Sequence, residues 1–168
     1  MLNINFEKFK KLHKKKINQV LYYELKSNNS REVENLINNF LQDKNSFIFE
    51  SVEKGIIKGR YTIFGKNPDK IWEFNNENIY YLNKNKKKKI KGDPVKIINN
   101  IIKNFNFKTP KKLPPLCSLL AGYFSYDTIR YFEKIKDTCI DDLKIPDIRI
   151  MRPTTCLLYT SPSPRDTG

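Results

Sequence analysis

Two apolar runs separated by a short turn constrain the fold more than any other part of this chain. Residues 47–52 and 56–64 are rich in aromatic and β-branched side chains, and Glu53-Lys54-Gly55 lies between them. Such runs are typical of β-strands, and the glycine can adopt the positive φ that a tight turn requires. The segment therefore predicts an antiparallel hairpin within a domain built on an antiparallel sheet.

Other runs extend this sheet. Residues 69–74 and 78–82 predict a second hairpin, with its turn at residues 75–77 and cross-strand aromatic pairs among Trp72, Phe74, Tyr80 and Tyr81. Residues 20–25 and 145–151 predict two more strands. The run LLAGYFSY at residues 119–126 is nearly continuous in apolar residues, which favours a strand that is buried on both faces at the centre of the sheet.

Four segments predict helices. Residues 6–16 predict a short basic amphipathic helix, and Asn29 and Ser30 can cap a second helix. Asp93 caps a third, with Pro94 at its first position, and Asp127 caps a short one over residues 128–134 in which Arg130 and Glu133 are spaced for an ion pair. The apolar stripes of the second and third helices are Val33, Leu36, Ile37, Phe40 and Leu41, and Val95, Ile98, Ile101, Ile102 and Phe105. The predicted fold class is α+β, a mostly antiparallel sheet with packed helices.

The chain is strongly basic, with a formal net charge of +14. Its lysine runs at residues 14–16 and 84–89 lie among asparagines and isoleucines, as AT-rich codon usage would produce. We therefore interpret them as solvated loops and tails and do not expect a nucleic-acid partner. The alternative, from another functional class, is a basic nucleic-acid-binding module that uses these lysines on phosphates.

The remaining composition limits the compartment and the chemistry. No apolar run approaches the roughly 20 residues of a membrane-spanning helix, and residues 1–16 lack the apolar core of a secretory signal, so we expect a cytoplasmic protein with no membrane partner. Cys117, Cys139 and Cys156 are odd in number and widely spaced, which predicts neither a disulfide framework nor a zinc site. His13, the single histidine, has no nearby carboxylate or cysteine in the sequence that would give it a catalytic or metal role.

Three motifs carry a resemblance to a known family. Glu50-Ser51, ten residues and then Thr62 resembles the Leu-Leu-Glu-Ser, ten residues, Ser pattern of anthranilate synthase component I, with Phe47-Ile48-Phe49 in place of the leucines and Thr62 in place of the serine. Residues 59–65 with Asn67-Pro68 resemble its Gly-Arg-Tyr-Ser-Phe-Ile-Gly block. Residues 122–127 with Arg130 and Glu133, followed by 141–143 and 145–147, resemble its next blocks, so the likeness covers roughly residues 15–155.

The resemblance implies an N-terminal regulatory fragment of an enzyme of tryptophan biosynthesis. The complete enzyme would convert chorismate and ammonia to anthranilate and pyruvate, with Mg²⁺ held in a later region and ammonia supplied by a glutamine amidotransferase subunit, component II. We expect no catalytic residues, no metal site and no activity in this fragment. Aminodeoxychorismate synthase component I, a related enzyme of folate synthesis, is the alternative within the same class.

The predicted site is a feedback site for L-tryptophan. Tryptophan offers a carboxylate, an ammonium group and a flat apolar indole, so it requires a hydroxyl, an acid and an apolar slot. By resemblance Ser51 is the tryptophan contact, and Glu50 and Thr62 support it. The alternative is that Glu50 only pairs with Lys58 or Arg60 and that Ser51 is an ordinary surface hydroxyl. For residues 122–127 we expect a structural role, with the aromatic side chains in the core and Gly122 permitting a close backbone approach.

The last thirteen residues differ in composition from the rest of the chain. CLLYTSPSPRDTG has none of the Lys, Asn and Ile bias that precedes it, and it resembles translated sequencing-library adapter. We predict a partial family domain over residues 1–155 and a non-native tail over 156–168. A genuine flexible tail is the alternative.

Overall fold

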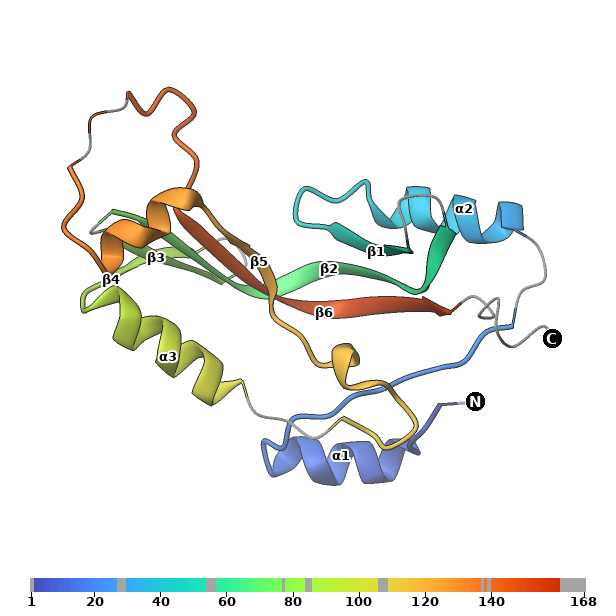
Figure 1. Cartoon of the computed structure of the whole chain (residues 1–168). Helices are drawn as coiled ribbons and strands as arrows, with labels where there is room; N and C mark the ends of the chain where they lie inside the picture. Colours follow the sequence, from blue (N-terminus) through green and yellow to red (C-terminus); the bar gives the residue numbers. More distant parts are fainter. Residues whose placement is uncertain are drawn as a thin grey trace.

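The computed structural model describes residues 2–26, 30–53, 57–76, 78–83, 86–105, 109–136, 138 and 140–160. Two helices precede a run of four strands, a third helix and two further strands, and the strands form a single sheet (Figure 1). In chain order the elements are α1 (Phe6–Lys14), α2 (Ser30–Phe40), β1 (Phe47–Glu53), β2 (Ile57–Asn75), β3 (Asn78–Asn83), β4 (Lys86–Ile90), α3 (Pro94–Asn104), the 3₁₀ turns η1 (Pro115–Cys117) and η2 (Tyr126–Tyr131) on either side of β5 (Ala121–Phe124), and β6 (Ile148–Thr160).

The sheet is antiparallel throughout its described pairings, as expected. Its order is β4-β3-β2-β6-β5, and β1 pairs with β2 outside this path. β2 pairs with β1 near its start, with β3 near its end, and with β6 along almost its whole length. Both predicted hairpins are therefore confirmed, but one long strand serves both of them.

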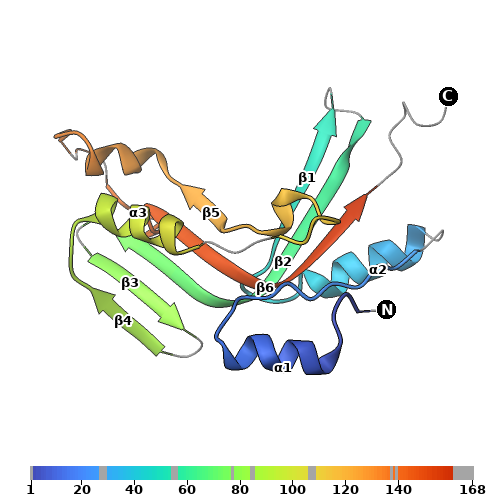
Figure 2. The same cartoon turned by 90° about the horizontal axis from the view of Figure 1, so that it is seen from below.

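A bend at Asn67-Pro68 divides β2 into two halves. Asn67 has a φ of 52°, and the register with β6 shifts between Pro68 and Lys70. A proline cannot donate a hydrogen bond to the ladder, and a bulge bends the strand that carries it. The β2–β6 ribbon accordingly curves, with β1 against one half and β3 and β4 on the other (Figure 2).

The main core lies between α3 and the second half of the sheet. Asp93 caps α3 by accepting a hydrogen bond from the Lys96 backbone N–H at 2.8 Å, and Pro94 occupies the first turn, as predicted. The buried side chains of this core are Phe74, Ile79, Ile98, Ile101, Ile148 and Ile150. Ile102, which we placed on the buried stripe, is instead 57% exposed, and Ile97 packs against the core.

A smaller contact joins α2 to the first half of the sheet. Phe64 of β2 is fully buried, and the Phe40 ring of α2 meets its ring edge-on at 6.2 Å between centroids. The predicted helix and its packing on a sheet are thus confirmed. Of its predicted buried stripe, Leu36 is instead 38% exposed, and the Val33 side chain lies outside the described part of the chain.

Three expectations were wrong. Residues 20–25 form no strand; their backbone instead bonds to the Asn3 side chain at Val20 O and Tyr22 N. Lysines 86–89 lie in β4, an edge strand that pairs with β3, where we expected a loop. β5 is not central but lies at the opposite edge; of its residues only Ala121 is buried, and Phe124 is 57% exposed.

Residues 156–160 continue β6 and pair with residues 61–65 of β2. The boundary that we placed before Cys156 stays a prediction, because strand pairing reports backbone hydrogen bonding and not the origin of the residues. None of the described helices is long and apolar enough to cross a membrane.

Substitution of Gly122 by alanine should destabilise the fold by about 2 kcal/mol. A Cβ at this position would lie 1.9 Å from the backbone oxygen of Arg149, so β5 and β6 would have to separate. This close approach confirms the role that we expected for Gly122. Urea unfolding followed by circular dichroism measures the loss.

Gly65→Ala is the matched comparison for this prediction. Its Cβ would overlap the Phe47 ring, at 2.2 Å from Cε1, and a ring can move where a paired backbone cannot. We therefore expect Gly65→Ala to lower the free energy of unfolding by less than Gly122→Ala does. Replacing the Phe47 ring with the smaller leucine side chain in the Gly65→Ala variant should reduce this loss further. A loss for Gly122→Ala no larger than that for Gly65→Ala would contradict the explanation.

Candidate functional site

The three predicted site residues lie together on the β1–β2 hairpin. Glu50 and Thr62 are direct partners across the two strands. Ser51 lies at the irregularity in β1, where the register shifts between Glu50 and Val52. The ten-residue spacing therefore brings the acid and the second hydroxyl opposite each other, with the first hydroxyl beside them.

The irregularity at Ser51 has a physical consequence. A bulge places an extra residue on one strand, increases the local twist and redirects the side chain at that point. Glu50 and Ser51 are both exposed, whereas Thr62 is only 7% exposed, because β2 lies between β1 and β6 and Thr62 pairs with Glu50 on one side and Tyr159 on the other. Glu50 and Ser51 are thus accessible to a ligand, and Thr62 can position them.

An aromatic surface lies on the face of β1 opposite to Glu50, because successive side chains of a strand point to alternate faces. The Phe47 and Phe49 rings are 4.8 Å apart, and Phe49 is 49% exposed. Phe47 lies directly over Gly65, which has no side chain to displace it. The hairpin therefore presents an acid, a hydroxyl and exposed aromatic area within one strand. The alternative pairing of Glu50 with Lys58 or Arg60 involves two side chains that lie outside the described part of the chain.

Asp147 organises the second motif region. Its carboxylate accepts hydrogen bonds from the Tyr131 hydroxyl and the Asn76 backbone N–H, both at 2.8 Å. Its backbone N–H donates to Phe74 O at 2.8 Å, and its backbone oxygen accepts from Ser125 N at 2.7 Å. One aspartate thus joins η2, the β2–β3 turn and the start of β6.

Several of our expectations for residues 122–134 were wrong. Ser125, not Asp127, is the N-cap residue of η2. Arg130 pairs with Asp127, whose carboxylate accepts a hydrogen bond from Arg130 Nε at 2.9 Å, where we expected an ion pair between Arg130 and Glu133. Tyr126 is 92% exposed and Phe124 is also exposed, so these aromatic side chains do not build the core. Sequence reasoning missed Asp147 as the organising residue; its one signal was a lone acid within the apolar run IPDIRI.

A cavity of about 430 Å³ opens beside this cluster, lined by Asn76, Gly92, Pro94, Asp127, Arg130, Tyr131 and Asp147. The acidic side chains in its wall are engaged with Tyr131 and Arg130. Within the described residues, no group of three or more His, Cys, Asp or Glu side chains comes close enough to hold a metal ion. The side chains of Asp127, Arg130, Tyr131 and Asp147 therefore brace one another in the wall of this cavity.

Tyr131→Phe should lower the free energy of unfolding by about 1.5 kcal/mol, because it removes a hydrogen bond to a carboxylate. Burial, together with the hydrogen bond to Asp147, raises the pKa of Tyr131 well above its usual value of about 10. A raised pKa stabilises the folded state below the pKa of the unfolded chain, and this contribution is lost as the pH rises through the folded pKa.

The difference in unfolding free energy between the parent and Tyr131→Phe should therefore be constant below pH 9 and shrink above about pH 10. Urea unfolding at a series of pH values measures it. Tyr126→Phe, at an exposed position two residues after Phe124, is the control and should change stability by less than about 0.5 kcal/mol. A pH-independent difference across this range would contradict the assignment.

Comparison with known proteins finds relatives that carry the same name. The chain is 30% identical over 156 residues to anthranilate synthase component 1 of Cereibacter sphaeroides, covering 89% of this chain and 31% of that protein. It is 33% identical over 125 residues to anthranilate synthase component 1 of Acetivibrio thermocellus, covering 74% of this chain and 25% of that protein. The chain thus spans between a quarter and a third of the length of these relatives. No family model matches it.

A solved structure supports the fold. Anthranilate synthase component I from Streptococcus pneumoniae superimposes with a TM-score of 0.52 at 20% sequence identity, covering 83% of this chain and 29% of that chain. At this identity the likeness concerns the fold alone, and it agrees with the predicted α+β class.

Proposed function

Because this chain is related to anthranilate synthase component I over most of its length, we propose that it forms the regulatory part of such a subunit. The complete enzyme converts chorismate and ammonia to anthranilate and pyruvate, and this part carries the site at which L-tryptophan inhibits it. The observation that carries the regulatory role is the direct pairing of Glu50 with Thr62 beside the exposed Ser51.

Each group of tryptophan has a suitable partner on this hairpin. The Ser51 hydroxyl donates a hydrogen bond to the ligand carboxylate, and the Glu50 carboxylate accepts from the ammonium group. Ile48, which shares the Glu50 face of β1 and is 39% exposed, offers apolar contact to the indole ring. Thr62, which is buried between β1 and β6, acts as a positioning residue that sets the spacing of Glu50 and Ser51.

The catalytic step belongs to the remainder of the enzyme in this proposal. In this proposal Mg²⁺ and the chorismate-binding groups belong to the later region of the subunit. Ammonia comes from a glutamine amidotransferase subunit, component II. This chain contributes effector recognition, and no chemical step passes through its side chains.

Ser51→Ala in the complete subunit should raise the tryptophan concentration for half-maximal inhibition at least about tenfold, since a hydrogen bond to a charged ligand group is lost. The assay is anthranilate formation at saturating chorismate over a tryptophan series. Thr138→Ala removes another exposed hydroxyl, away from the hairpin, and should leave inhibition unchanged. Unchanged inhibition in Ser51→Ala would overturn the effector site, and a product other than anthranilate from the parent enzyme would overturn the assigned reaction.

The purified 168-residue chain alone should form no anthranilate from chorismate, ammonium and Mg²⁺. The reason is that its described residues contain neither a metal cluster nor a catalytic constellation. Anthranilate fluorescence detects the product sensitively, and the complete subunit under identical conditions serves as the positive control. Mg²⁺-dependent fluorescence from the chain alone would show that catalytic groups had been overlooked.

A further inference from the structure

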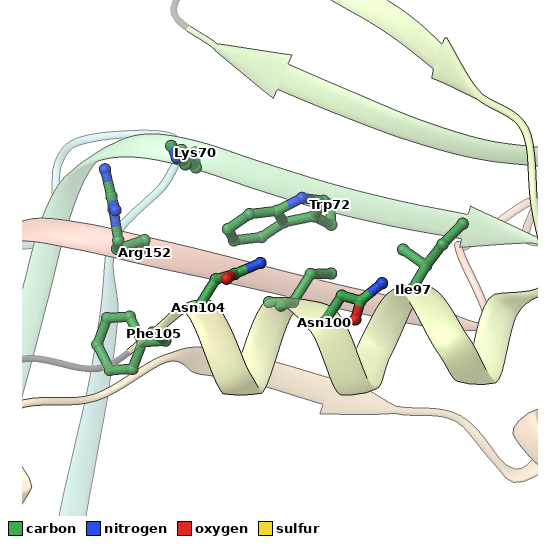
Figure 3. A pocket seen from close by; sticks show the side chains of 8 residues that line it. Lys70, Trp72, Ile97, Asn100, Asn104, Phe105 and Arg152 are labelled. Atoms are coloured by element: carbon green, nitrogen blue, oxygen red, sulfur yellow. The ribbon is translucent and has the colours of Figure 1, made fainter.

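A second, smaller cavity lies between α3 and the β2–β6 ribbon, apart from the hairpin site. Its volume is about 220 Å³. The Asn67-Pro68 bend of β2 separates it from Thr62 and the hairpin site. The lining residues are Lys70, Trp72, Ile97, Asn100, Ile101, Asn104, Phe105 and Arg152 (Figure 3). Nothing in the proposed tryptophan site uses these side chains, so their arrangement calls for its own explanation.

The cavity has an aromatic wall and two amide groups. Trp72 lies across it from α3, and Phe105 lies at the end of the helix (Figure 3). Asn100 and Asn104 are four residues apart, which places both amides on the same face of α3. The Asn104 amide points toward Trp72 and the Asn100 amide lies nearer Ile97 (Figure 3), and neither is hydrogen-bonded to another described residue. Both amides are therefore available to a ligand.

The charge of the cavity is positive. Arg152 donates from Nε to Asp69 Oδ1 at 2.7 Å and from a terminal nitrogen to Asp69 Oδ2, so its charge is matched and its position fixed. Lys70 forms no ion pair with any described carboxylate and carries the remaining positive charge. A cation beside a half-buried indole favours an anionic ligand with a flat ring.

The volume of the cavity limits the size of the ligand. Pockets for drug-sized molecules usually measure about 300–1,000 Å³, so a cavity of about 220 Å³ suits a single ring. We propose that this cavity binds a monocyclic aromatic carboxylate, with the ring against Trp72, the carboxylate at Lys70 and the amides of Asn100 and Asn104 at its edge. This site does not depend on the proposed tryptophan site.

Trp72 provides a direct test because it is the only tryptophan in the chain. Titration of the full chain with benzoate should change its fluorescence in a saturable way, with half-saturation at about 1 mM or below. Benzamide, which lacks the charge, and cyclohexanecarboxylate, which lacks the aromatic ring, should each bind at least about fivefold more weakly. Side-chain amide shifts of Asn100 and Asn104, followed by NMR, report binding independently of the indole.

Lys70→Gln should weaken benzoate binding at least about fivefold. Lys96→Gln removes the same charge from an exposed position on α3 outside the cavity and should leave binding unchanged. Circular dichroism confirms that both variants fold. The proposal fails if neither fluorescence nor amide shifts saturate by about 20 mM benzoate, if benzamide binds as tightly as benzoate, or if the two lysine variants behave alike.

Discussion

The antiparallel pairing of β2 with β6 forms the ribbon on which the rest of the sheet is assembled. β2 pairs with β6 from Tyr61 to Phe74, and the remaining strands attach to one or other member of this ribbon or to β3. Side chains reinforce the pairing on both sides of the bend: Thr154 donates to Asn67 O at 2.6 Å, Arg152 binds Asp69, and Arg149 Nε donates to Glu73 at 3.2 Å. Because these contacts lie far apart in sequence, the ribbon requires the closure of a long loop during folding.

The bend in this ribbon separates the two proposed binding sites. Before Pro68, β2 carries Thr62 and the β1 hairpin with its proposed effector site. After it, β2 carries Lys70 and Trp72 in the cavity under α3, and then Phe74 in the main core. The two halves share a backbone, yet each packs its own helix, α2 on the first and α3 on the second.

Local patterns in the sequence predicted the local structure well. The hairpins, the α2 helix and the Asp93-Pro94 cap of α3 depend on neighbours within a few residues, whereas the pairing of Glu50 with Thr62 also requires the register shift at Ser51. The run at residues 119–126 failed because an apolar composition predicts burial but does not say which face is covered. Pro68 separated two predicted strands that a bulge in fact joins. The bulge at Ser51 and the contacts of Asp147 depend on distant strands, and no local pattern specifies them.

The strands at the two ends of the order β4-β3-β2-β6-β5 differ in chemical character. β4 presents consecutive lysines 86–89 along one edge, with Lys87 also bonded to Glu73 and lying over the Tyr80 ring. Edge strands of like charge resist pairing with one another, a device that keeps open sheets from joining. β5, at the other edge, is short and carries exposed aromatic side chains. Electrostatic repulsion therefore disfavours growth of the sheet at the β4 edge, and added salt, which screens this repulsion, should weaken that protection while leaving the effect of strand length at β5 unchanged.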